Sequence, residues 1–167
     1  SRLFLRNTGL TSPVNREFMT RRFERFGIPA NRLRIARGSD RETILRNYGE
    51  IDISLDTWPY NGGNTIAESV WQGVPAVTLK GHRFASAYGA SILKACGLGD
   101  LVAETPAQFI EIAARLADNH DRLVALRYSL RSDVFTYGFS DSVAFARKVE
   151  TAFEQMLREK LRVGDAA

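Results

Sequence analysis

A pair of glycines followed by two short polar residues is the feature of this chain best suited to chemistry. Gly62 and Gly63 lack Cβ atoms, so they can adopt backbone angles closed to other residues and let a ligand approach the main chain closely. Asn64 and Thr65 follow at the predicted start of a helix, where backbone N–H groups are unpaired and the partial charge is positive. The segment therefore predicts a site for an anion such as a phosphate.

A carboxylate follows this anion site one helical turn later. Glu68 comes four residues after Asn64, which places both side chains on the same face of a helix. A carboxylate can accept two hydrogen bonds from a ribose diol while the helix start holds the phosphates of the same nucleotide. Glu68 is equally well explained as an exposed acid stabilised by the helix dipole. These residues alone leave both interpretations open.

Other polar residues are weaker candidates for a functional role. Asp56 is assigned a structural role, because Asp-Thr at the end of a strand turns the chain through its own side-chain hydrogen bonds. Lys80, His82 and Arg83 could meet a diphosphate, although an exposed turn explains them as well. Cys96 is expected in the core. Two histidines and one cysteine form no recognisable metal site, so neither a metal nor a cofactor is expected, and no catalytic residue is identified.

The elements that must position these residues alternate between strands and helices. Strands are predicted at 3–5, 32–36, 51–55, 74–79 and 101–102, and helices at 13–26, 41–48, 64–71, 84–95, 107–118, 120–132 and 140–161. Such alternation predicts an α/β fold with a doubly wound parallel sheet and a helical C-terminal tail. The glycine loop and the loop at 37–41 then follow strands, at the sheet edge where ligands bind.

Composition narrows the function classes further. The chain has 167 residues, of which 44% are hydrophobic and 25% charged, as expected for a globular domain with a core. The single cysteine and the lack of a run of about 20 apolar residues favour a cytoplasmic protein without a membrane span. The net charge of +4 comes from arginines interspersed with acids, so no nucleic-acid partner is expected. The chain begins without Met or a signal pattern, which suggests a piece of a longer protein.

Several blocks, in order along the chain, resemble the C-terminal catalytic lobe of O-linked N-acetylglucosamine transferases and their bacterial and SPINDLY-like relatives, which form glycosyltransferase family 41. The blocks are Asp52-Ile-Ser-Leu-Asp56, Pro59-Tyr-Asn-Gly-Gly-Asn-Thr65 with Glu68, Trp71-Gln-Gly-Val-Pro-Ala-Val-Thr78 and Phe84-Ala-Ser-Ala-Tyr-Gly-Ala-Ser91. The match runs from about Leu3 to about Leu157. The resemblance implies the Rossmann-like C-terminal half of a GT-B fold, incomplete at its N-terminus. Residues 1–139 would form the donor-binding lobe, and the helix at 140–163 would pack across to an absent N-terminal lobe.

The resemblance also implies a function and the residues that serve it. The reaction would transfer a sugar, GlcNAc from UDP-GlcNAc or fucose from GDP-fucose in some relatives, to Ser or Thr of a protein acceptor. The implied donor-binding residues are Asn64 and Thr65 at the diphosphate, Glu68 at the ribose, Tyr60, Asn61, Gly62 and Gly63 in the loop under the phosphates, and Ser39 and Arg41 in the loop that contacts the base. The implied partners are the N-terminal lobe and upstream tetratricopeptide repeats, so the isolated chain is not expected to turn over.

The chain departs from the family pattern in three places. Family members usually carry two threonines after the glycines, often preceded by His, whereas this chain has Gly63, Asn64 and Thr65, of which Asn64 can still donate and cap. A His common near position 44 is Ile44 here, and the phosphate-binding Lys of the family is absent. Two alternatives stay open: another GT-B nucleotide-sugar enzyme, such as an epimerase or a GDP-fucose-dependent transferase, and a non-catalytic α/β interaction module.

Overall fold

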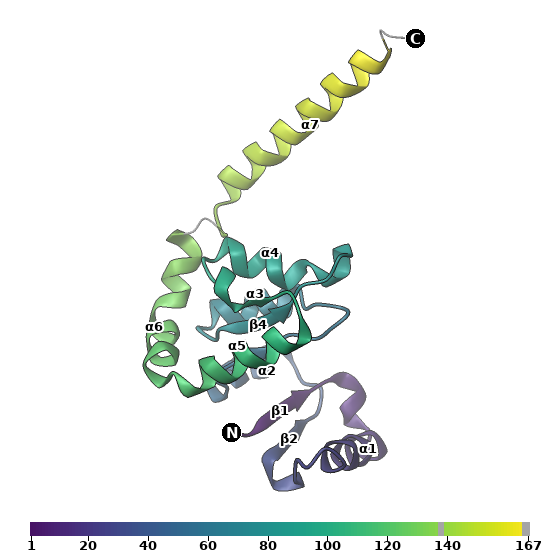
Figure 1. The fold of residues 1–167 in the computed structure, drawn as a ribbon, viewed down its shortest axis with the longest axis vertical. Helices are drawn as coiled ribbons and strands as arrows, with labels where there is room; N and C mark the ends of the chain where they lie inside the picture. The colour runs from purple at the N-terminus through teal and green to yellow at the C-terminus, as the bar shows by residue number, and fades with distance from the viewer. Residues whose placement is uncertain (137–138, 165–167) are drawn as a thin grey trace. The chain divides into compact units, whose positions relative to one another are not determined.

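The structure is a computed structural model that describes residues 1–136 and 139–164, with side chains described as far as residue 162 (Figure 1). Contacts divide the chain into two compact units, Ser1–Asp52 and Ile53–Ala167, which are described separately below. The division predicted between residues 139 and 140 remains a prediction. Among the described residues, no helix has both the length and the apolar character needed to cross a membrane.

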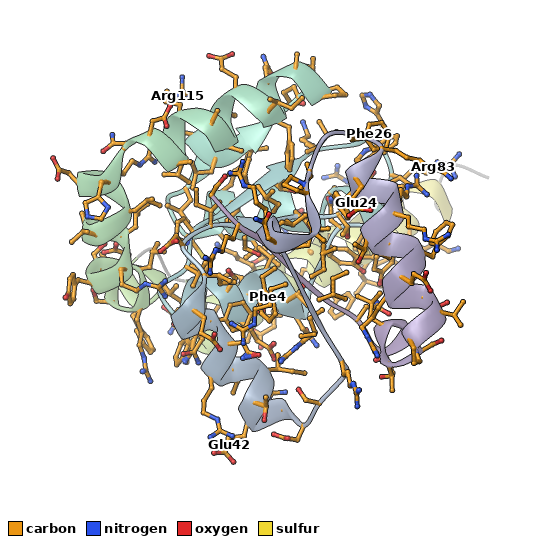
Figure 2. All side chains as sticks on the ribbon, turned by 90° about the horizontal axis from the view of Figure 1, so that it is seen from below. Phe4, Glu24, Phe26, Glu42, Arg83 and Arg115 are labelled. Carbon is orange, nitrogen blue, oxygen red and sulfur yellow. The ribbon has the colours of Figure 1, made fainter. Side chains whose placement is uncertain are left out.

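The first unit contains two parallel strands and two α-helices. Its elements are β1 (Leu3–Arg6), α1 (Pro13–Glu24), β2 (Leu33–Ala36) and α2 (Arg41–Asn47), with 3₁₀ turns at Thr8–Thr11, Ala30–Arg32 and Tyr48–Glu50. The strands pair in register from Leu3 opposite Leu33 to Arg6 opposite Ala36. The guanidinium of Arg34 lies 4.8 Å from the centroid of the Phe4 ring. Phe4 is labelled in Figure 2. This strand-then-helix order confirms the prediction for this part of the chain.

Local signals place the ends of the helices in the first unit. Pro13 is the first residue of α1, where its missing N–H costs nothing. Gly27 follows the helix with a φ of 78°, the left-handed conformation that glycine adopts readily. Asp40 caps α2, because its Oδ1 accepts a hydrogen bond of 2.8 Å from the Thr43 amide.

The second unit contains a three-stranded parallel sheet and five α-helices among its described residues. Its elements are β3 (Ser54–Leu55), α3 (Asn64–Trp71), β4 (Ala76–Leu79), α4 (Tyr88–Ala95), β5 (Val102–Ala103), α5 (Pro106–Asp118), α6 (His120–Thr136) and α7 (Ser142–Gly164), with 3₁₀ turns at Phe84–Ser86 and Gly99–Leu101. The strand order is β3-β4-β5, and each strand is parallel to its neighbour. Parallel strands alternating with helices confirm the predicted α/β class.

Several elements of the second unit differ from their predicted bounds, and two of them differ in kind or greatly in length. The strand predicted at 51–55 is reduced to Ser54 and Leu55, since its partner β4 pairs with it only from Ala76 onward. The helix predicted at 84–95 is divided into a 3₁₀ turn and α4. The division follows from Ser86, whose hydroxyl accepts from the Arg83 amide at 3.1 Å and donates to the Arg83 carbonyl at 3.0 Å, closing a separate turn.

The core of the second unit lies between the sheet and its helices. Apolar side chains from α3, β4, α4, α5 and α6 are almost completely buried there, namely Ile66, Val70, Val77, Leu93, Leu116, Leu130 and Val134. The α6 helix covers the end of α3, where the ring of Phe135 meets Trp71 edge-on at 5.3 Å and the guanidinium of Arg131 lies 5.1 Å from the Trp71 ring. This packing fixes the strand ends from which the functional loops emerge.

Candidate functional site

The glycine loop connects the carboxyl end of β3 to the first residue of α3. Its backbone is tied to the next strand and turn, since the Asp56 amide donates to the Val77 carbonyl at 2.9 Å and the Asn61 amide donates to the Ala85 carbonyl at 2.9 Å. The loop therefore lies at the carboxyl edge of the parallel sheet, as the sequence predicts for a ligand-binding loop.

Asn61 holds this loop from within. Its side chain is completely buried, and its Nδ2 donates to the Thr57 carbonyl at 2.9 Å and to the Leu79 carbonyl at 3.4 Å. Its Oδ1 has no hydrogen-bond partner among the described residues. The Asn61 side chain thus connects the start of the loop to the end of β4. Tyr60 beside it has an exposed side chain, while its carbonyl accepts a hydrogen bond of 2.6 Å from the Thr57 hydroxyl.

The two glycines differ in what surrounds them. A Cβ atom at Gly62 would lie 2.1 Å from the Thr65 hydroxyl oxygen, whereas a Cβ at Gly63 would meet no atom within 4 Å. Neither glycine has a positive φ. The expectation that these glycines adopt a left-handed backbone closed to other residues is therefore wrong. Glycine is needed at position 62 because the first turn of α3 folds back tightly against the loop.

The first turn of α3 carries two polar residues and lacks an N-terminal side-chain cap. The residue that precedes the helix, Gly63, provides no side-chain cap, and the first turn contains no acid. Asn64 is the first helical residue and does not cap the helix, contrary to the expectation that it could do so. Asn64 and Thr65 have exposed side chains. An uncapped helix start with polar residues in its first turn is a favourable place for an anion.

Glu68 lies in the same helix, one turn after Asn64 and half-buried. The i, i+4 spacing within α3 places both residues on one face, as predicted. Ser39 and Arg41 belong to the first unit, where they are exposed on either side of the α2 cap. The structure therefore brings together the predicted residues of the glycine loop and of α3. The loop predicted to contact the base belongs to the first unit.

Asp56 is more extensively connected than a turn residue needs to be. Its Oδ1 accepts hydrogen bonds from the amides of Thr57 at 2.9 Å and Gly62 at 2.7 Å, and its Oδ2 accepts one of 2.6 Å from the Thr78 hydroxyl. Burial raises the pKa of Asp56, and the hydrogen bonds from Gly62, Thr78 and Thr57 partly offset that effect. Sequence reasoning found only the local turn, since nothing in the spacing of Asp56 and Thr78 indicates their contact.

The remaining candidates do not form a second site among the described residues. Lys80 pairs with Glu104 at 3.3 Å, and His82 is an exposed turn residue beside it. Cys96 is buried, and burial raises its pKa to about 11, so the thiol is unreactive near neutral pH, as the sequence predicted. The part of the chain that the structure describes holds no group of three or more residues suited to a metal ion.

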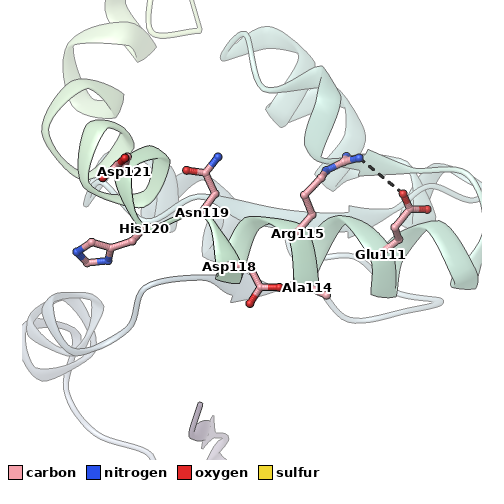
Figure 3. Close-up of a pocket in the computed structure, with 7 residues that line it drawn as sticks. All are labelled: Glu111, Ala114, Arg115, Asp118, Asn119, His120 and Asp121. Atoms are coloured by element: carbon pink, nitrogen blue, oxygen red, sulfur yellow. Dashed lines mark ion pairs between the residues drawn. The ribbon is translucent and has the colours of Figure 1, made fainter.

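A shallow groove lies at the corner between the C-terminal end of α5 and the start of α6 (Figure 3). Its lining is polar and exposed, and it includes the ion pair between Arg115 and Glu111 at 3.7 Å. Asn119 caps α6 by accepting from the Arg122 amide at 3.0 Å, and His120 is exposed beside it. These roles are structural.

Comparison with known proteins identifies the family to which this arrangement belongs. The family model described as Glycosyl transferase family 41 matches residues 10–149. The chain is a member of this family. This confirms the resemblance noted in the sequence, including the class of enzyme that it implies.

Relatives of known name support the same assignment. A probable UDP-N-acetylglucosamine–peptide N-acetylglucosaminyltransferase SPINDLY from Hordeum vulgare is 40% identical over 112 residues, which cover 67% of this chain and 12% of the relative. A UDP-N-acetylglucosamine–peptide N-acetylglucosaminyltransferase from Caenorhabditis elegans is 33% identical over 101 residues, covering 60% of this chain and 9% of the relative. The family 41 chain therefore spans about an eighth of the length of the plant relative.

A solved structure is similar over almost the whole chain. The O-GlcNAc transferase of Thermobaculum terrenum, in a mutant form, superposes with a TM-score of 0.86 at 37% sequence identity and covers 95% of this chain and 30% of its own. Together with the parallel strands, their flanking helices and the helical C-terminal stretch, this similarity confirms a Rossmann-like half of a GT-B fold for the family 41 chain.

Proposed function

We propose that this family 41 chain binds the nucleotide diphosphate of a UDP-sugar through the glycine loop and the first turn of α3. The observation that carries the proposal is the start of α3, which has no side-chain cap and follows a loop whose backbone is tied to β4 and to the turn after it. A rigid loop that ends at an uncapped helix start favours a bound anion. The choice of UDP-GlcNAc as donor is supported by the names of the relatives.

Each of the predicted donor-binding residues then has a distinct role. Asn64 and Thr65 hold the diphosphate with backbone amides and polar side chains, and Glu68 accepts hydrogen bonds from the ribose hydroxyls. Ser39 and Arg41 remain the predicted contacts of the base. Hydrogen bonds to the diphosphate stabilise the charge that develops on it as the sugar is transferred, so the same loop assists the leaving group.

The transfer reaction itself is proposed for the whole protein. Its acceptor would be a Ser or Thr of a protein, in keeping with the peptide named as the acceptor of the relatives. Because this chain spans 30% of the solved O-GlcNAc transferase chain, we expect donor binding and not transfer from the 167-residue chain alone. No metal is needed in this scheme.

The proposal is tested by titrating the 15N-labelled chain with UDP, GDP and inorganic pyrophosphate at millimolar concentrations. UDP is expected to shift the amide signals of residues 61–68 and to bind more tightly than GDP. Glu68→Ala is expected to raise the Kd of UDP about tenfold, as for the loss of a hydrogen bond to a charged group, and to leave the Kd of pyrophosphate unchanged because pyrophosphate has no ribose.

A matched control is Glu111→Ala, which removes an exposed helical glutamate from α5. It is expected to leave both affinities unchanged. Tighter binding of GDP than of UDP would favour the alternative of a GDP-fucose-dependent enzyme. Signals that move only outside residues 61–68, or that do not move with any of the three ligands, would refute the donor site and favour the interaction module.

A further inference from the structure

Asp56 connects three segments of the second unit through one carboxylate: the end of β3, the glycine loop and β4. It follows β3 directly, and its partners lie one residue later, six residues later in the glycine loop and 22 residues later in β4. An aspartate that only turned the chain would need the contact with the Thr57 amide alone. The other two contacts need a different explanation.

The contact with β4 makes the position of the carboxylate rigid. Thr78 is completely buried in β4, and its hydroxyl donates to Asp56 Oδ2 at 2.6 Å. The first turn of α4 packs directly against this pair, since a Cβ atom at Gly89 would lie 2.3 Å from Asp56 Oδ2 and 2.4 Å from Thr78 Oγ1. A buried strand and a close-packed helix therefore leave the carboxylate one orientation.

The contact with the glycine loop transmits this orientation to the anion site. The Gly62 amide donates to Asp56 Oδ1 at 2.7 Å, which directs that N–H inward, toward the protein. The amides that follow, at Gly63 and Asn64, belong to the start of α3. Only one residue separates Gly62 from Asn64, so a fixed Gly62 amide restricts where the next two amides can lie.

We propose that Asp56 is a positioning residue for nucleotide binding: anchored on Thr78 through Oδ2, it holds the Gly62 amide through Oδ1 and so orients the first-turn amides of α3 toward the diphosphate. The inference rests on the proposed function of the same loop. It assigns no contact with the ligand to Asp56 itself. The three hydrogen bonds that the carboxylate accepts from Thr57, Gly62 and Thr78 stabilise its negative charge.

The experiment measures the Gly62 amide and the UDP affinity in the 167-residue chain and three variants. Asp56→Ala removes all three hydrogen bonds of the carboxylate and is expected to speed exchange of the Gly62 amide and to raise the Kd of UDP about tenfold. Asp56→Asn keeps an acceptor for Gly62 and an amide that can donate to Thr78, and it is expected to restore both readouts to within about threefold. Thr78→Val removes only the anchor and is expected to act in the same direction as Asp56→Ala, by about threefold.

Two controls separate positioning from a general loss of stability. Val70→Ala removes buried methyl groups from α3 and touches none of these contacts; it is expected to lower the thermal midpoint and leave the Kd of UDP unchanged. Asp118→Ala removes an exposed carboxylate and is expected to change nothing. If Asp56→Ala does not fold, Thr78→Val decides the question by the same two readouts.

The outcomes distinguish this inference from the function on which it rests. Failure of the unmodified chain to bind UDP at residues 61–68 overturns both. Binding by the unmodified chain, with an unchanged Kd in Asp56→Ala or in Thr78→Val, overturns the positioning role alone. A higher Kd in the Ala variant, with recovery in the Asn variant and no change in Val70→Ala, supports it.

Discussion

At the scale of single residues, the two adjacent loop glycines have different surroundings: Gly62 is closely packed and Gly63 faces open space. Gly62 lies against Thr65, Ile66 and Asp56, with Thr65 Oγ1 only 2.1 Å from the position of a Cβ atom, whereas the corresponding space at Gly63 is empty. A methyl group at position 62 must therefore displace the Thr65 hydroxyl, which is one of the proposed diphosphate contacts. The pair offers a matched test of the loop.

Gly62→Ala is expected to raise the Kd of UDP about tenfold, because the Thr65 hydroxyl turns away from the ligand. Gly63→Ala is expected to lower the thermal midpoint less than Gly62→Ala does, since its methyl group meets no atom of the folded chain within 4 Å. Amide titration of both variants, with thermal midpoints recorded alongside, makes the comparison. Equal effects of the two substitutions would contradict the packing explanation.

At the scale of elements, the end of α3 depends on a glycine that no other residue can replace without strain. Gly73 has a φ of 78°, and a Cβ atom there would lie 2.6 Å from the backbone oxygen of Arg127 in α6. Both the left-handed backbone and the close approach of α6 oppose a side chain. Gly99 has neither feature, since the nearest atom to its Cβ position is Lys94 Cγ at 3.7 Å.

Gly73→Ala is therefore expected to lower the free energy of unfolding by about 3 kcal/mol, whereas Gly99→Ala lowers it by less than about 1 kcal/mol. Urea unfolding followed by circular dichroism measures both in the same unit of the chain. A loss at Gly73 no greater than that at Gly99 would mean that α6 moves away without cost, and the α3–α6 contact would then be weaker than the structure indicates.

The C-terminal element α7 presents large apolar side chains to solvent, including Phe145, Phe153 and Leu157, which are 69%, 64% and 60% exposed. A helix with an apolar stripe ordinarily buries it against another element. The prediction from the family resemblance, that this helix packs on the N-terminal lobe of the full protein, remains a prediction.

At the scale of the whole molecule, carboxyl groups of the two units make stability depend on pH in opposite directions, because their pKa values are shifted in opposite directions. In the first unit, hydrogen bonds from Thr43 lower the pKa of Asp40, and Arg34 lowers that of Glu50. Their contribution to stability is present above their ordinary values of 3.8 and 4.5 and is lost as the pH falls through the lowered pKa values. In the second unit, burial raises the pKa of Asp56 above 3.8, so its contribution is present below that value and is lost as the pH rises.

Asp56→Asn removes only the second of these effects. The stability of the unmodified chain relative to this variant is expected to fall as the pH rises through the raised pKa of Asp56, because ionisation of the half-buried carboxyl is opposed in the folded state and the amide does not ionise. Urea unfolding of both proteins at pH values on either side of this pKa measures the difference. A difference independent of pH would show that the hydrogen bonds to the carboxylate fully cancel the cost of burial.

The starts and ends of several helices could be predicted from residues adjacent in the sequence. The proline at the start of α1, the Thr105-Pro106 start of α5 and the glycine after α1 act within one turn of the chain, so their effects follow from the local sequence. The position of the glycine loop after a strand and before a helix follows in the same way. Family resemblance then supplied the ligand class, because several such blocks occur in a characteristic order.

The sequence by itself thus determined the α/β class and the family, and it predicted the place of an anion site. Only the tertiary structure decided that Asn61 is buried and holds the loop from within, that glycine is needed at position 62 by packing, and that Asp56 joins the loop to Thr78. The physical reason is distance along the chain. Contacts between residues 22 positions apart depend on how strands and helices assemble, and the spacing of residues within any one element does not encode that assembly.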